Sequence, residues 1–180
     1  MPRYLPVQID AANEPIKQVY AEVQQKLGHV PNFLKTVAHN DRILKPMADA
    51  FLSFVGESSL SEKVRQLVIL RVCQLDKCKP TVDRHTLLAK QAGWSDDHLK
   101  AMDDYNQSEL FPYYEKEVLR LVELVRSTPD EIPGDYWAQL DNHYTSDQIV
   151  EMVALIGFMG MINHLIMALQ IEPDPLPAAV

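Results

Sequence analysis

Cys78 is the residue best placed to act as a nucleophile. It lies between Lys77 and Lys79, just before a helix that we expect to begin at Pro80. The positive end of a helix and nearby cations both favour a thiolate over a thiol. Cys73 lies inside an apolar helix, where we expect a packed and unreactive thiol. Cys78 is therefore the candidate reactive cysteine wherever solvent reaches it.

His85 is the candidate proton-transfer partner of Cys78. It follows Cys78 by seven residues, which is two helical turns, and Thr81 and Val82 fall between them on the same face. Two turns span about 10 Å, too far for a direct hydrogen bond, so a water, a substrate or a backbone bend must connect the two groups. The spacing taken alone favours an ordinary packed cysteine and a polar histidine.

Helices are the elements that must position these residues. The 180 residues include six Gly and 12 Pro, the hairpin dipeptides Asn-Gly and Asp-Gly are absent, and apolar residues recur at three- and four-residue steps. We expect one all-α domain over residues 1–172 and a Pro-rich tail over 173–180. The pattern predicts helices over 14–27, 31–38, 42–55, 61–76, 80–91, 95–104, 113–127, 134–141 and 145–169.

Composition excludes several classes of protein. Apolar residues make up 47% of the chain, enough for a sizeable core. The net charge of −8 repels phosphate backbones and anionic lipids, so we expect no nucleic-acid partner. Asn163 and His164 interrupt the apolar stretch of the last helix, which favours a buried helix over a membrane span. With two cysteines and no signal-peptide pattern, we expect a cytoplasmic protein.

Several segments together resemble the carboxymuconolactone decarboxylase family, which includes the AhpD-like alkylhydroperoxidases. The central one reads R-Q-L-V-I-L-R-V over 65–72, followed by Cys78, His85 and A-K-Q-A-G-W-S over 89–95. The segment G-H-V-P-N-F at 28–33 and the apolar helix over 146–163 are also similar to the family. The resemblance implies an AhpD-like all-α fold and a homo-oligomer, a trimer or a hexamer, with the active site near subunit contacts.

The resemblance also implies roles for individual residues. In the peroxidase branch, a Cys-x-x-Cys pair works with a Glu and a His in a proton relay. Cys78 matches the first cysteine and His85 the histidine, but Thr81 replaces the second cysteine and Gln66 replaces the glutamate. Threonine forms no disulfide and glutamine only orients by hydrogen bonding, so the dithiol cycle of the family is broken. The decarboxylase branch carries Glu and an aromatic residue at Thr81 and Val82, so its pattern is broken too.

Three functions remain open. A one-cysteine peroxidase with an antioxidant role would form a sulfenic acid on Cys78, reduced by an external thiol or by Cys73. A lyase or isomerase, such as a decarboxylase of a cyclic carboxylate, would use His85 as acid or base, with Arg71 or Arg84 holding the carboxylate. A catalytically silent oligomeric scaffold is the third.

If the chain is catalytic, we expect the first of these functions, acting on a small-molecule substrate; we expect no cofactor and no metal. None of the histidines has the partner spacing of a zinc site. The residues expected to form the site are Cys78, His85 and Gln66 as the catalytic group, and Thr81, Val82 and Arg71 as the substrate-binding group.

Overall fold

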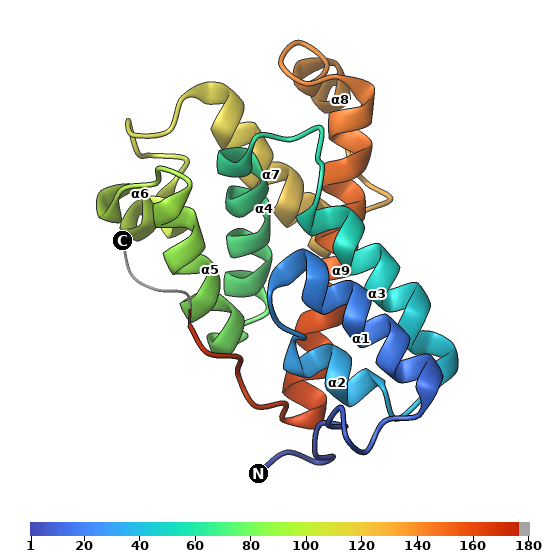
Figure 1. Cartoon of the computed structure of the whole chain (residues 1–180). Coiled ribbons are helices and arrows are strands. Elements are labelled where there is room, and N and C mark those ends of the chain that lie inside the picture. The colour runs from blue at the N-terminus through green and yellow to red at the C-terminus, as the bar shows by residue number, and fades with distance from the viewer. Residues whose placement is uncertain (177–180) are drawn as a thin grey trace. The chain divides into compact units, whose positions relative to one another are not determined.

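Every regular element in residues 1–176, the part of the chain that the structure describes, is helical. The all-α prediction is therefore confirmed in this computed structural model (Figure 1). Four residues of the predicted Pro-rich tail, 177–180, lie outside the described residues. The elements are α1 (Glu14–Leu27), α2 (Asn32–Val37), α3 (Asp41–Val55), α4 (Glu62–Leu75), α5 (Lys79–Gln91), α6 (Asp96–Ala101), the 3-10 turn η1 (Met102–Asp104), α7 (Tyr113–Ser127), α8 (Gly134–Leu140) and α9 (Ser146–Leu169).

Local capping signals set these boundaries. The Asn13 side chain accepts a hydrogen bond from the backbone N–H of Ile16 at 3.1 Å, and so begins α1. The Ser61 hydroxyl caps α4 in the same way, through the N–H of Val64 at 3.3 Å. Gly28, in the left-handed region with φ of 76°, ends α1. Such signals are local, so the predicted helices differ from the observed ones by no more than one residue at either end, with η1 completing the helix predicted over 95–104.

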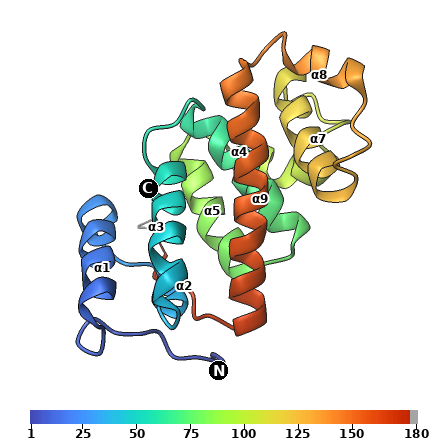
Figure 2. The same cartoon turned by 90° about the vertical axis from the view of Figure 1, so that its right-hand side faces the viewer.

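The described residues group into two compact units. One unit comprises residues 1–58 and 164–175 and contains α1, α2 and α3. Within it α3 packs against both α1 and α2 (Figure 2). Phe33 and Phe51 meet edge to face, with ring centroids 4.9 Å apart. The single domain predicted over residues 1–172 stays a prediction.

The other unit includes residues 59–163 and contains every residue predicted for the site. Its central element is α4, which packs against both α5 and α7 (Figure 1). Leu67, Val68 and Val72 on α4 are each no more than 1% exposed, and the helix has little polar surface, as its sequence predicts. Two polar side chains of α4, Gln66 and Arg71, are buried with them. Buried polar groups need partners inside the protein, and those partners shape the site.

The longest helix, α9, runs over Ser146–Leu169. Its residues up to Asn163 belong to the unit that holds the site, and those from His164 onward belong to the other unit. Among the described residues it is the one helix long and apolar enough to cross a membrane by length and composition. That is weak evidence, because buried core helices of soluble proteins share these properties. The absence of a membrane span stays a prediction.

Candidate functional site

Cys78 sits in the tight turn between α4 and α5. Lys77 before it adopts a left-handed backbone conformation with φ of 54°, and the Cys78 N–H donates to the Cys73 carbonyl at 3.1 Å. Cys78 is the N-cap residue of α5, and its carbonyl accepts the N–H of Val82 at 3.0 Å. The residue is only 1% exposed. The sulfur thus belongs to the positive end of a helix, and a reagent reaches it only after a local opening of the turn.

A cluster of buried polar side chains lies against this turn, centred on Asn163 of α9. The Asn163 Nδ2 donates to Asp76 Oδ2 at 2.8 Å. Since a carboxylate only accepts, the Asn163 Oδ1 must face the other way, where the Thr81 hydroxyl lies at 2.8 Å and the Cys73 sulfur at 3.8 Å. Asn163 itself is fully buried. One amide therefore joins α4, α5 and α9 in the interior of this unit.

Thr81 and Val82 occupy the first turn of α5. The Thr81 hydroxyl lies 3.0 Å from the Cys78 carbonyl as well as 2.8 Å from Asn163 Oδ1, and the residue is 7% exposed. Val82 is half-buried. The hydroxyl of Thr81 is thus hydrogen-bonded within the protein. The sequence instead predicts that Thr81 contacts a substrate.

Cys73 behaves as its apolar surroundings predict. It is fully buried, and burial raises the pKa of its thiol to about 12. At neutral pH it is a protonated thiol packed beside Asn163. It is therefore a poor nucleophile for thiol–disulfide exchange.

Arg126 completes the buried cluster from α7. Its guanidinium forms an ion pair with Asp76, whose side chain is only 4% exposed. The guanidinium passes close over Gly160 of α9, where an added Cβ would lie 2.5 Å from Arg126 Nη1. The glycine leaves the room that this side chain needs to reach Asp76.

His85 is paired with Gln66 across the α4–α5 contact. The His85 Nδ1 lies 2.9 Å from Gln66 Oε1, so this ring nitrogen carries the hydrogen and donates it to the amide oxygen. Gln66 is 4% exposed. Burial lowers the pKa of His85 from 6.5 to about 3, and the neighbouring Arg84 guanidinium lowers it as well. His85 is therefore neutral at physiological pH, with the lone pair on Nε2.

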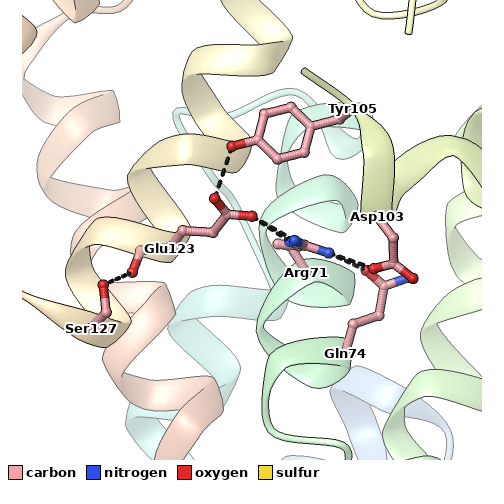
Figure 3. Close-up of polar contacts among 6 residues, drawn as sticks. All are labelled: Arg71, Gln74, Asp103, Tyr105, Glu123 and Ser127. Atoms are coloured by element: carbon pink, nitrogen blue, oxygen red, sulfur yellow. Dashed lines mark hydrogen bonds and ion pairs between the residues drawn. The ribbon is translucent and has the colours of Figure 1, made fainter. Parts of the chain in front are cut away.

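Arg71 belongs to a network of ion pairs and hydrogen bonds with Asp103 and Glu123 (Figure 3). Its Nη1 lies 2.9 Å from Asp103 Oδ1, and its Nε lies 3.2 Å from Glu123 Oε1. Glu123 also accepts the Tyr105 hydroxyl at 2.9 Å. The Arg71 side chain is 8% exposed. The sequence predicts that Arg71 binds a substrate carboxylate. In the structure, its guanidinium is instead paired with two carboxylates of the protein itself, those of Asp103 and Glu123.

The structure thus brings the predicted residues together in two groups. Cys78 and Thr81 meet in the turn, and Gln66 meets His85, while Arg71 belongs to neither group. Asn163, which contacts Thr81, Cys73 and Asp76, was not among the predicted site residues. Its sequence signal is a lone amide within the long apolar run of the last helix, and such a residue needs buried partners. Across residues 1–176, no three His, Cys, Asp or Glu side chains are grouped so that they could hold a metal ion.

Comparisons with known proteins agree with this fold. Residues 43–103 match the model of the carboxymuconolactone decarboxylase family. The uncharacterized protein YdfG of Bacillus subtilis is 25% identical over 117 residues, which cover 64% of this chain and 80% of that protein.

Two solved structures share the fold. The alkylhydroperoxidase AhpD core of an uncharacterized peroxidase-related protein from Ralstonia eutropha JMP134 superposes with a TM-score of 0.76, at 19% identity, over 96% of this chain and 92% of that chain. The debrominase Bmp8, solved as a cysteine-to-alanine variant with 2,3,4-tribromopyrrole, superposes with a TM-score of 0.73, at 16% identity, over 94% and 90%. Their different names show that this fold alone does not determine the reaction.

Gly160→Ala tests the Arg126–Asp76 pair. The new Cβ makes the guanidinium shift and so weakens its ion pair with the buried Asp76 carboxylate, which keeps its hydrogen bond from Asn163. We expect the free energy of unfolding, measured by urea denaturation, to fall by about 1–3 kcal/mol. Gly134→Ala, at the start of α8, is the control, because its Cβ also meets open space. We expect it to be neutral or slightly stabilising. Equal effects of the two substitutions would contradict the assigned role of Gly160.

The depressed pKa of His85 predicts a pH dependence of stability. Below pH 6.5 the unfolded chain takes up a proton on His85 that the folded protein does not bind until about pH 3. The free energy of unfolding therefore falls as the pH drops through this window. We expect the native protein to lose more stability than His85→Gln between pH 7 and pH 5 in parallel urea titrations. Parallel curves for the two proteins would show that His85 is not held neutral.

Proposed function

The chain belongs to the carboxymuconolactone decarboxylase family, and from this premise we propose that it is an AhpD-like thiol-dependent peroxidase with one catalytic cysteine. One observation carries the proposal. His85 is a neutral histidine whose Nδ1–H is bound to Gln66, and it lies on the same helix that Cys78 caps. The Nε2 lone pair is then available to accept the thiol proton.

The reaction begins at the Cys78 sulfur. The sulfur attacks one oxygen of a hydroperoxide, so that an S–O bond forms while the O–O bond breaks. The thiol proton passes through His85 Nε2 to the departing alkoxide, by way of the peroxide or a water, since two helical turns separate the residues. The products are an alcohol and the Cys78 sulfenic acid. His85 with a pKa near 3 holds this proton only in passing.

An external thiol completes the cycle. It condenses with the sulfenic acid to a mixed disulfide and water, and a second thiol then releases Cys78 and leaves with the first as a disulfide. Cys73 is unsuited to this task because burial raises its pKa to about 12. Thr81, at the position of the second cysteine of the family pattern, has no thiol.

A proton-transfer enzyme, such as a decarboxylase or lyase of a cyclic carboxylate, is the second candidate. It is favoured by the contrast between the oriented, neutral His85 and the buried Cys78. In such an enzyme His85 acts as the base or acid and Cys78 only shapes the site. The commitment of Arg71 to Glu123 and Asp103 counts against it, because the substrate carboxylate then needs another cation.

We also propose a homo-oligomer, a trimer or a hexamer, that acts on a small molecule in the cytoplasm. Exposed apolar or small residues recur along α9 at four- and three-residue steps, namely Val150, Ala154, Gly157 and Met161. This spacing forms one stripe of the helix, as a contact between copies requires. The free thiols and the net charge of −8 support the location and the absence of a nucleic-acid partner.

Peroxide consumption with dithiothreitol as reductant tests the main proposal. We expect turnover by the native protein and loss of turnover in Cys78→Ser, because the nucleophile is removed. Cys73→Ser is the matched control and should keep its activity. A probe specific for sulfenic acid should label Cys78 alone.

The remaining outcomes separate the other functions. Native protein without turnover and without trapped sulfenic acid would contradict the peroxidase. Conversion of a cyclic carboxylate that survives Cys78→Ser but not His85→Gln would establish the second candidate, and no activity of either kind would leave an oligomeric scaffold.

Sedimentation velocity tests the oligomer. We expect the native protein to sediment as a trimer or hexamer and Met161→Glu to dissociate it, because a charge would be buried in the contact. Leu110→Glu is the control, since Leu110 is 44% exposed and lies outside the stripe. A monomeric native protein, or equal behaviour of the two variants, would overturn the proposed interface.

A further inference from the structure

The Gln66–His85 pair is continued by a third residue, Glu62, one turn earlier on α4. The Gln66 Nε2 donates to Glu62 Oε1 at 2.8 Å, while Gln66 Oε1 lies 2.9 Å from His85 Nδ1. The other oxygen of Glu62 pairs with Arg65. An exposed carboxylate is thus joined to a half-buried histidine through one buried amide.

The Glu62 carboxylate determines the orientation of the Gln66 side-chain amide. A carboxylate only accepts hydrogen bonds, so the NH2 group of the amide must face Glu62 and the amide oxygen must face His85. A neutral imidazole carries one hydrogen, and facing an oxygen it must carry it on Nδ1. With the amide reversed, its NH2 would face Nδ1, and the ring hydrogen would move to Nε2.

We propose that Glu62 is a positioning residue, which fixes the rotation of the Gln66 amide and thereby leaves Nε2 of His85 as the nitrogen that accepts a proton. Its importance for catalysis rests on the proposed function, whereas its effect on the histidine does not. The arrangement also gives a physical reason for glutamine at position 66. A glutamate there would set a second carboxylate one helical turn from Glu62, and like charges at that spacing repel.

The tautomer of His85 is measured by long-range proton–nitrogen correlation NMR on protein labelled with nitrogen-15 in its histidine rings, at pH 7. His85→Gln assigns the signal by its loss. We expect the native protein to show the Nδ1–H form. In Glu62→Ala the amide is free to rotate, so signals of the Nε2–H form should appear. Glu62→Gln should do the same, because an amide at position 62 both donates and accepts.

Asp97→Ala is the matched control, because Asp97 is an exposed acid on α6 that pairs with Lys100. We expect it to keep the native tautomer. Nε2–H in the native protein, or an unchanged Nδ1–H signal in both Glu62 variants, would overturn the proposal. Circular dichroism verifies that each variant is folded.

Peroxide turnover separates this proposal from the proposed function. In an active enzyme, the rate constant of peroxide reduction by Glu62→Ala should fall in proportion to the population of the Nδ1–H form. If the native protein reduces no peroxide but the tautomer still shifts, the peroxidase fails and the positioning role of Glu62 stands. If turnover is present and Glu62→Ala changes neither rate nor tautomer, the positioning role fails alone.

Discussion

The hydrogen bonds of one buried amide, Asn163, hold together the part of the protein that carries the candidate chemistry. Asp76 fixes the orientation of this amide, and Arg126 in turn neutralises Asp76. The amide oxygen then satisfies the Thr81 hydroxyl and lies beside the Cys73 thiol. Each of these groups would be costly to bury alone, and together they form a connected network. The start of α5 is thereby tied to α4 and α9.

The two halves of the site differ in their environments. In the turn, Cys78 is shielded from solvent, so its thiol chemistry needs a local opening. Two turns along α5, His85 is kept neutral by burial and is oriented by Gln66, with its lone pair on Nε2. In the proposed peroxidase, reaction of the thiol therefore couples opening of the turn to a histidine that is already oriented.

The sequence predicts those features of the structure that depend on residues close together in the chain. Helix ends were predicted closely because caps such as Asn13 act within one turn. The Cys78–His85 spacing could also be read locally. The partners of Asn163 lie 82 to 90 residues away in the chain, and no local pattern announces that they meet. Arg71 was assigned to a substrate for the same reason, since Glu123 is 52 residues away.

A single turnover of Cys78 with peroxide tests most directly whether Cys78 is the nucleophile. The native protein would be treated with one equivalent of a hydroperoxide in the absence of reductant, and the peptides carrying Cys78 and Cys73 would be weighed by mass spectrometry. We expect one added oxygen on Cys78, none on Cys73, and slower addition in His85→Gln. Oxidation of Cys73 first, or of neither cysteine in the folded protein, would contradict this role of Cys78.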